Sequence, residues 1–441
     1  MSFRVPQMLR RKSFLTMQPL LPKRLGSSRF GSAVNLLSAM NQMKKVPVSQ
    51  SGSRSLMTTK YGILHMECCG AGFCSYSVQR WTSYTSTAVP PAAVVSVASR
   101  DERRGFMACF PDLVRNLTEV GFHKDLQDAN KWFAKVLQYN VPGGKMNRGL
   151  AVPLTYQMLV PAERHTADVM QKAYIVGWCV ELLQAFFLVL DDIMDGSETR
   201  RGKPAWYRKD DRGLPAINDG VLLEAGIYKL LKLHCSGEPY YPSIIDIFHN
   251  TTMKTVLGQS LDLLGSQSGQ LDLSKYTMGR YTAIVKYKTA HYSFHLPIAL
   301  AMHMAGISDQ ESHRQAKAIL LEMGHLFQVQ DDFLDCFGDP AVTGKIGTDI
   351  QDGKCSWLVV VALQRASAAQ KQVIQENYGR DDPECVERIK RLYTELNLVS
   401  VYKKYELSNY DHICRLVEQT SRGMPHKVFY KMLEKIYKRE S

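Results

Sequence analysis

Apolar residues recur every three or four positions from about residue 105 onward, and runs in which apolar and polar residues alternate are scarce. This spacing places apolar side chains on one face of an α-helix, whereas alternation would indicate strands. Glycine and proline interrupt the pattern, most clearly at Pro142, Gly143 and Gly144, where we expect a helix to break. The pattern predicts helices over residues 110–139, 150–160, 165–192, 219–236, 242–264, 272–303, 308–337, 353–377, 383–397, 398–420 and 425–438.

The number and length of these helices favour one large domain over residues 101–441. No internal repeat of fixed period stands out, and a region of this length fits a bundle of roughly ten helices better than two small domains. We therefore expect an all-α fold. The most apolar segment, residues 176–190, is interrupted by Glu181 and Gln184, so we expect no transmembrane segment.

Charge is distributed unevenly along the chain. Residues 1–100 hold 13 lysines and arginines against one acid, Glu67, so they carry +12 of the formal net charge of +13. A basic, serine-rich and almost acid-free composition is typical of an organelle transit peptide. We expect residues 1–100 to be a mitochondrial transit peptide and linker, disordered or removed, with a cytoplasmic form arising from an internal start such as Met107. The alternative is a basic arm that stays attached and binds RNA or lipid.

The remaining residues, 101–441, are almost neutral overall, so net charge does not indicate a nucleic-acid-binding body, and we expect no nucleic-acid partner. The ten cysteines do not form paired CxxC motifs, so their spacing does not favour a zinc site. Cys68, Cys69 and Cys74 cluster in the basic segment, and the others are scattered singly. We expect reduced thiols in an intracellular compartment.

Two aspartate clusters follow strongly apolar segments. Residues 186–190 run directly into the first cluster, and residues 327–330 precede the second. Aspartates four positions apart lie above one another on a helix and repel, so each cluster requires a compensating cation unless it is simply a solvated helix end. Two copies favour the cation, and carboxylates favour Mg²⁺, with diphosphate oxygens and water as further ligands. The candidate metal ligands are Asp191, Asp192, Asp195, Asp331, Asp332 and Asp335.

Basic residues are grouped around these two clusters in the sequence. A glycine-flanked turn, residues 143–149, can contact a phosphate through side-chain charge and backbone N–H groups. Another basic residue lies in the helix before Pro297, which should kink that helix. Each basic residue alone would be read as a surface residue, but their grouping favours a diphosphate ligand. The grouped residues are Lys145, Arg148, Arg200, Arg201, Lys288, Lys345 and Lys354.

Four ordered motifs read FFLVLDDIMDGSETRRG, GGKMNRG, YKTAHYSFHLP and FQVQDDFLDCFGDPAVTGKIGTDIQDGKCSW. They resemble the motifs of farnesyl diphosphate synthases, a family of short-chain trans-isoprenyl diphosphate synthases, and the resemblance covers residues 105–441. It implies an isoprenoid synthase bundle of about ten core helices around a deep central cavity, usually as a homodimer. It also implies head-to-tail condensation of isopentenyl diphosphate with dimethylallyl and then geranyl diphosphate, giving (E,E)-farnesyl diphosphate by Mg²⁺-assisted ionisation, condensation and proton elimination.

The resemblance implies a role for each matching residue. Three Mg²⁺ ions, with Mn²⁺ or Co²⁺ as substitutes, would be bound by Asp191, Asp195 and Asp331. Residues that would support the metals indirectly are Asp192, Asp332, Asp335 and Asp349. The allylic diphosphate would be held by Arg200, Lys288 and Lys345, with Thr289 and Gln328 near the developing cation. Isopentenyl diphosphate would be held by Lys145, Asn147, Arg148, Gln184 and Arg201, with Lys354 closing the site from its loop.

Phe186 and Phe187 precede the first aspartates by about one turn and would limit the product to about fifteen carbons. Two features depart from the family pattern. The chain ends in KRES, only part of the usual basic run, and His291 and His295 stand where aromatic residues are commoner. These histidines would either pack the helix or line the cavity, where they could shorten the product. The alternatives are therefore a geranyl diphosphate synthase, a synthase of mixed products set by the metal, and a non-catalytic synthase subunit, which the two intact clusters disfavour.

Overall fold

The computed structural model describes residues 57–59, 62–64, 100–119, 124–266, 272–343, 347–420 and 424–437. The chain divides into two units, residues 1–89 and 90–441. In the first unit, the described strands β1 (Met57–Thr59) and β2 (Gly62–Leu64) pair in antiparallel orientation. The rest of the predicted transit peptide and linker up to residue 99, including its three cysteines, lies outside the described residues.

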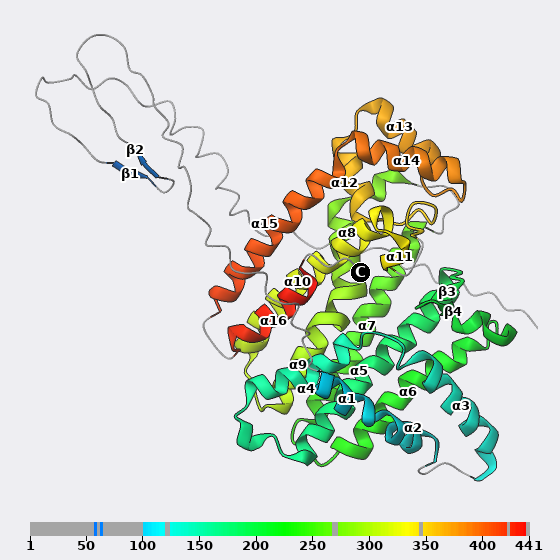
Figure 1. The fold of residues 1–441 in the computed structure, drawn as a ribbon, viewed down its shortest axis with the longest axis vertical. Helices are drawn as coiled ribbons and strands as arrows, with labels where there is room; N and C mark the ends of the chain where they lie inside the picture. Colours follow the sequence, from blue (N-terminus) through cyan, green and yellow to red (C-terminus); the bar gives the residue numbers. More distant parts are fainter. Residues whose placement is uncertain are drawn as a thin grey trace, which may run out of the picture. The chain divides into compact units, whose positions relative to one another are not determined.

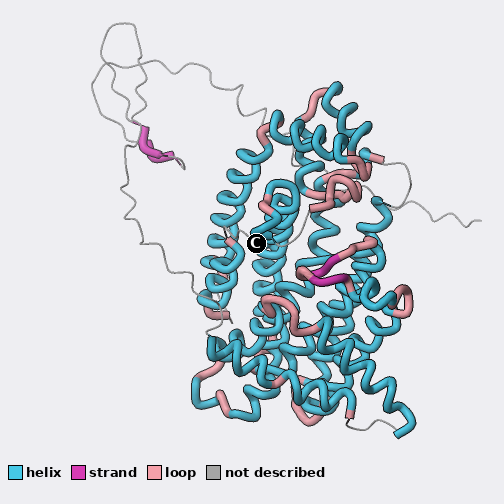
Figure 2. The backbone as a smooth tube through the Cα atoms, turned by 45° about the vertical axis from the view of Figure 1, so that its right-hand side comes forward, coloured by secondary structure: helices cyan, strands magenta, loops and turns pink. Residues whose placement is uncertain are grey.

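The second unit is built almost entirely from helices where it is described (Figures 1 and 2). Its α-helices are α1 (Arg100–Ala108), α2 (Phe110–Thr118), α3 (Gln127–Asn140), α4 (Asn147–Leu159), α5 (Ala167–Met194), α6 (Ala216–Cys235), α7 (Tyr241–Ser266), α8 (Met278–Ile284), α9 (Leu296–Met304), α10 (Gln310–Phe337), α11 (Pro340–Thr343), α12 (Trp357–Arg365), α13 (Ala368–Asn377), α14 (Pro383–Glu395), α15 (Leu398–Glu418) and α16 (His426–Ile436).

Shorter elements connect these helices. The 3-10 helices are η1 (Lys124–Leu126), η2 (Ala162–Arg164), η3 (Trp206–Asp211) and η4 (Leu273–Lys275), and η5 (Val285–His295) is a π-helix. Strands β3 (Thr199–Arg200) and β4 (Lys203–Pro204) form a short hairpin after α5. The all-α prediction is confirmed for the described residues of this unit, apart from that hairpin.

Most predicted helices have the expected bounds, but three are divided. The segment 110–139 forms α2 and α3, and 353–377 forms α12 and α13, because the side chain of Ser367 caps a new helix by accepting from the backbone N–H of Gln370. The expected helix break at residues 142–144 is confirmed, since α3 ends at Asn140 and α4 begins at Asn147.

Helix α5 lies at the centre of the largest apolar core, packed against α4, α6 and α9. The backbones of α4 and α5 touch, since a Cβ added to Gly177 would lie 2.4 Å from the carbonyl oxygen of Gly149. By length and composition α5 could cross a membrane, contrary to the sequence-based expectation, but 78% of its most apolar window is buried inside the fold. This burial is what a core helix requires.

The segment 272–303, predicted as one kinked helix, is instead α8, η5 and α9 in succession. The π-helix ends just before Pro297, whose missing N–H removes one helical hydrogen bond. Two glycines in flanking helices allow close approach to it. A Cβ on Gly258 of α7 would lie 2.2 Å from the nitrogen of Lys288, and one on Gly324 of α10 would lie 2.4 Å from the Cβ of Ala290. The π-helix is therefore tightly held between α7 and α10.

His291 and His295 lie on this π-helix with their ring centroids 5.9 Å apart in an edge-on arrangement. His291 is 2% exposed, and its Nδ1 is buried without a hydrogen-bond partner. Burial lowers the pKa of each imidazole to about 3, and the positive charges of Lys254 of α7 and Lys317 of α10 lower both further. Both histidines are therefore neutral at physiological pH.

Because folding lowers both histidine pKa values, the unfolded chain binds more protons between about pH 3 and 6.5, and stability falls as pH drops through that window. At pH 5 the loss relative to pH 7 should be about 2 kcal/mol for each histidine. The double variant His291→Phe, His295→Tyr should lose most of this acid sensitivity. Urea unfolding of both proteins at pH 5 and 7 measures it, and parallel losses in the two proteins would contradict the assignment.

Candidate active site

The first aspartate cluster lies at the C-terminal end of α5. Helical periodicity stacks Asp191 and Asp195 one turn apart, and the backbone N–H of Asp195 donates to the carbonyl of Asp191 at 2.8 Å. Asp191 accepts a hydrogen bond from Gln259 of α7 at 3.1 Å, and its oxygens lie 3.5 Å from both Lys288 and Arg200. Burial opposes ionisation of Asp191, but the surrounding lysine and arginine charges outweigh it and lower its pKa.

The middle aspartate of each cluster is turned away from its neighbours into the fold. Asp192 is 2% exposed and accepts from the Nε of Arg200 at 2.9 Å. Asp332 is 5% exposed and accepts from Gln328 at 2.9 Å and from the backbone N–H of Trp357 at 2.7 Å. A one-residue step rotates a helical side chain by about 100°, which explains why both middle residues leave the common face. Their predicted contribution to metal binding remains a proposal.

The second cluster lies at the end of α10, under the loop formed by residues 347–356. The backbone N–H of Asp349 donates to Asp335 at 3.0 Å. A Cβ on Gly347 would lie 1.8 Å from the carbonyl oxygen of Asp335, so this close loop contact requires glycine. The loop then places Lys354 with its Nζ 3.6 Å from Asp349 and 3.7 Å from Asp195. It thereby joins the second cluster to the first.

Two lysines thus link acids from different elements. Lys288 of η5 lies 2.7 Å from Asp262 of α7 as well as 3.5 Å from Asp191. Burial disfavours the charge of Lys354, but the neighbouring aspartates outweigh it and raise its pKa well above the ordinary value. Lys354, which we expect to close the site from its loop, lies between Asp195 of the first cluster and Asp349 of the same loop.

Among the described residues, no three His, Cys, Asp or Glu side chains converge into a group able to hold a metal alone. The carboxylates are separated and paired with lysine and arginine instead. Their chemistry nevertheless fits Mg²⁺, because oxygen-only ligand sets with several open positions suit this ion when a phosphate completes them. The arrangement thus fits a metal that arrives with a diphosphate.

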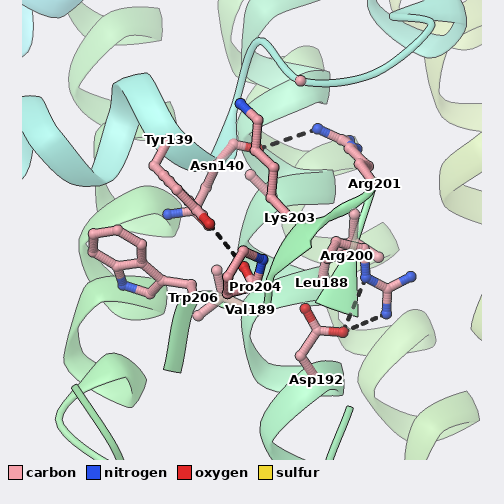
Figure 3. A pocket seen from close by; sticks show the side chains of 12 residues that line it. Tyr139, Asn140, Leu188, Val189, Asp192, Arg200, Arg201, Lys203, Pro204 and Trp206 are labelled. Carbon is pink, nitrogen blue, oxygen red and sulfur yellow. Dashed lines mark hydrogen bonds and ion pairs between the residues drawn. The ribbon is translucent and has the colours of Figure 1, made fainter. Parts of the chain in front are cut away.

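A second cationic region lies beside the first cluster, where α3, the 143–149 turn and the β3–β4 hairpin meet (Figure 3). Arg201 lies across the glycine turn, since a Cβ on Gly144 would be 3.0 Å from its guanidinium. Its NH1 donates to the carbonyl of Asn140 at 3.4 Å. Desolvation and the positive charges of Arg200 and Arg148 lower the pKa of Arg201. Such a concentration of positive charge calls for an anionic ligand.

Arg148, whose positive charge acts on Arg201, is held by contacts with η5. Its Nε donates to Ser293 at 2.9 Å, and its guanidinium lies 5.0 Å from the ring centroid of Tyr292. The Tyr292 ring in turn meets Phe187 edge-on, 5.3 Å between centroids, and Phe187 lies 5.1 Å from Phe186. Aromatic side chains therefore connect the cationic region with the segment that precedes the first aspartates.

The remaining predicted site residues are distributed as follows. Thr289 donates to Gln328 at 3.0 Å, so these two lie together between η5 and α10. Gln184 is partly buried on α5 with its Oε1 unpartnered, Asn147 is half-buried at the start of α4, and Lys145 is exposed. Lys345 lies outside the described residues, as do the last four residues of the chain.

The geometry can be compared with known proteins. A model of the family described as polyprenyl synthetase matches residues 130–396. The chain belongs to the polyprenyl synthetase family. It is 54% identical to a farnesyl pyrophosphate synthase of Bos taurus over 344 residues, which are 78% of this chain and 98% of the relative. It is 55% identical to the enzyme of that name from Homo sapiens over 339 residues, 77% of this chain and 81% of the relative.

Solved structures that are similar to this chain include T. brucei farnesyl diphosphate synthase complexed with the bisphosphonate BPH-722, with a TM-score of 0.72 and 34% identity. The same enzyme complexed with risedronate gives a TM-score of 0.70 and 32% identity. Each match covers 77% of this chain and all of the other. The polyprenyl synthetase fold therefore accounts for the all-α arrangement of the second unit.

Sequence analysis missed Gln259 and Asp262, which contact Asp191 and Lys288. They lie three positions apart on one face of α7, within a mostly apolar stretch. Two polar residues on one face of this stretch were the indication in the sequence that the face has a polar partner. The packing of α7 on η5 shows that these partners are Asp191 and Lys288.

Asp262 should hold Lys288 back from Asp191, because the lysine Nζ lies 2.7 Å from Asp262 and 3.5 Å from Asp191. In Asp262→Asn, we expect Lys288 to shift toward Asp191 and compete with Mg²⁺ there. The Mg²⁺ concentration for half-maximal prenyl transfer should rise, and kcat/KM for the allylic substrate should fall about tenfold. Steady-state assays test this, with Asp246→Asn on the exposed face of α7 as the control. Equal Mg²⁺ dependence in both variants would rule the role out.

Proposed function

We propose that the protein is a prenyltransferase that condenses isopentenyl diphosphate with dimethylallyl and then geranyl diphosphate to give (E,E)-farnesyl diphosphate. The observation that carries this is that Lys288 and Lys354 contact the first aspartate cluster, that the loop carrying Lys354 also contacts Asp335 of the second cluster, and that a separate cationic region containing Arg201 lies beside them. Two diphosphates need two such regions. The membership in the polyprenyl synthetase family and the similarity to farnesyl pyrophosphate synthases support the same reaction.

Mg²⁺ is the proposed cofactor, with three ions expected and Mn²⁺ or Co²⁺ as substitutes. Asp191, Asp195 and Asp331 would hold it, and the charge of the metal would stabilise the departing diphosphate. Arg200, Lys288 and Lys354 supply fixed positive charge on the same side. Since the carboxylates already pair with these cations, tight metal binding should depend on the diphosphate.

The chain itself positions the reacting groups and excludes water. Arg148 and Arg201, with the glycine turn, orient isopentenyl diphosphate, and Tyr292 packs below Arg148. Thr289 and Gln328 present polar atoms from η5 and α10 toward the region of the developing carbocation. An apolar wall protects that cation from water. The released diphosphate is the natural acceptor for the proton lost at the end, so no side-chain base is required.

This function is tested by incubating residues 101–441 with isopentenyl and dimethylallyl or geranyl diphosphate, with and without Mg²⁺. We expect a fifteen-carbon diphosphate that forms only with the metal. Chromatography of the dephosphorylated products gives their chain length. A folded sample that releases no prenyl product would refute the enzyme, and a ten-carbon end product would favour the geranyl alternative.

Product length should depend on Phe186 and Phe187, whose rings contact each other and, through Phe187, Tyr292. Replacing both by alanine removes the two rings that lie about one turn below the first aspartates. We expect products longer than fifteen carbons, with turnover of geranyl diphosphate retained. The product profile by chromatography is the measurement, and Phe333→Leu on α10 is a control that leaves this region intact. An unchanged profile in the double variant would sink the proposal.

We also propose that the protein is a homodimer. Helix α7 exposes Met253, Val256, Leu257 and Leu264 by 62%, 45%, 58% and 68% of their surfaces, and helical spacing places them on one side. Large apolar side chains gathered on one helix favour a protein–protein contact. A single-subunit mass in sedimentation equilibrium would contradict this.

The localisation that we propose is mitochondrial, through residues 1–100, with a cytoplasmic form from an internal start. The proposal is supported by the composition of this segment, which carries +12. A fluorescent protein fused to residues 1–100 should enter mitochondria only while the membrane potential is intact. Uptake that persists after the potential is collapsed would speak against a transit peptide.

A further inference from the structure

The β3–β4 hairpin that carries Arg200 and Arg201 is too small to hold its own position. Its register pairs Thr199 with Pro204 and Arg200 with Lys203, which leaves Arg201 and Gly202 as the turn. Both turn residues have positive φ, 56° and 72°, as two-residue hairpin turns require. An isolated two-stranded hairpin is marginal in water even when it is longer. Tertiary contacts must therefore fix the two arginines.

Those contacts converge on one buried carboxylate, Asp219, at the start of α6. Asp219 is fully buried, and each of its oxygens accepts two hydrogen bonds. Trp132 of α3 and the NH2 of Arg212 donate to Oδ1 at 2.8 and 3.0 Å. Trp206 of η3 and the Nε of Arg212 donate to Oδ2 at 2.9 and 3.0 Å. Both carboxylate oxygens of Asp219 are therefore satisfied, and its negative charge is paired with the guanidinium of Arg212.

Two of these donors, Trp206 and Arg212, stand at the two ends of η3, the segment that follows the hairpin. Trp206 begins η3 two residues after β4 ends, and its ring lies 5.1 Å from that of Tyr139 of α3. The Tyr139 hydroxyl donates to the carbonyl of Pro204 in β4 at 2.8 Å (Figure 3). Asp219 therefore ties β4, η3 and α3 together immediately behind the cationic region.

The two arginines depend on this anchor to different degrees. Arg200 has a second support, because it also donates to Asp192 of α5 at 2.9 Å. Arg201 contacts the end of α3 at Asn140, 3.4 Å away, and lies across the glycine turn. Any loosening of α3 against the hairpin therefore moves Arg201 more than Arg200.

We infer that Asp219 is a positioning residue that sets Arg201 for isopentenyl diphosphate, acting through Trp206, Arg212 and the end of α3. The inference rests on the proposed function, which assigns Arg201 to that substrate. Asp219 itself touches neither substrate. Its effect should therefore appear in the affinity for one substrate and leave the chemical step almost unchanged.

The test is steady-state kinetics on the full-length protein with Asp219→Asn, which preserves the shape of the side chain but replaces an acceptor oxygen by an NH2 group facing two donors. We expect KM for isopentenyl diphosphate to rise about tenfold, the effect of weakening one charge-assisted contact. KM for geranyl diphosphate and kcat should change by less than about threefold. A purely structural role would instead lower kcat through lost active protein and leave both KM values unchanged.

Two further variants make the test decisive. Trp132→Phe removes one donor to Asp219 and should raise KM for isopentenyl diphosphate by about threefold. This variant tests the inference if Asp219→Asn does not fold. Glu238→Gln removes an ion pair with Lys172, 2.6 Å long and remote from the hairpin, and should leave that KM unchanged. If KM for isopentenyl diphosphate is unchanged in both Trp132→Phe and Asp219→Asn, the inference about Asp219 is wrong and the proposed function still stands. An inactive wild type overturns the proposed function and this inference with it.

Discussion

The pairing of buried aspartates with cations from other helices is the interaction on which the site depends. Asp191 and Asp195 would repel each other on the end of α5 without Lys288, Arg200 and Lys354 close by. Each cation comes from a different element, η5, β3 or the 347–356 loop. These charges are stable only when all the elements are assembled, which ties the electrostatics of the site to completion of the fold.

That assembly requires unusually close helix packing. Gly258 and Gly324 admit the π-helix η5 between α7 and α10, and the widened turn before Pro297 carries Lys288 and Thr289. Similarly, Gly347 lets the loop return across Asp335. At each of these positions a Cβ would lie less than 3.0 Å from an atom of the neighbouring segment, so any other residue would push the two segments apart. Glycine here serves close approach, because it alone lacks a Cβ.

The two aspartate clusters share the same spacing on a helix, but their middle aspartates are held by different partners. Asp192 is held by a charged partner, Arg200, whereas Asp332 is held by an amide and a backbone N–H, and burial raises its pKa to about 7. The first cluster is thus coupled to the hairpin and the second to the start of α12. A diphosphate bound between them would contact two separately supported halves of the fold.

The helical class, most helix bounds and the aspartate and arginine motifs follow from the sequence, because helical periodicity and local charge spacing are encoded within a few residues. The three-dimensional packing was needed to show that Asp192 and Asp332 face inward, that Lys354 lies between Asp195 and Asp349, and that Gln259 and Asp262 contact Asp191 and Lys288. These outcomes depend on which distant helix packs against each residue. The π-helix likewise required its neighbours, since no local pattern specifies how closely α7 and α10 approach it.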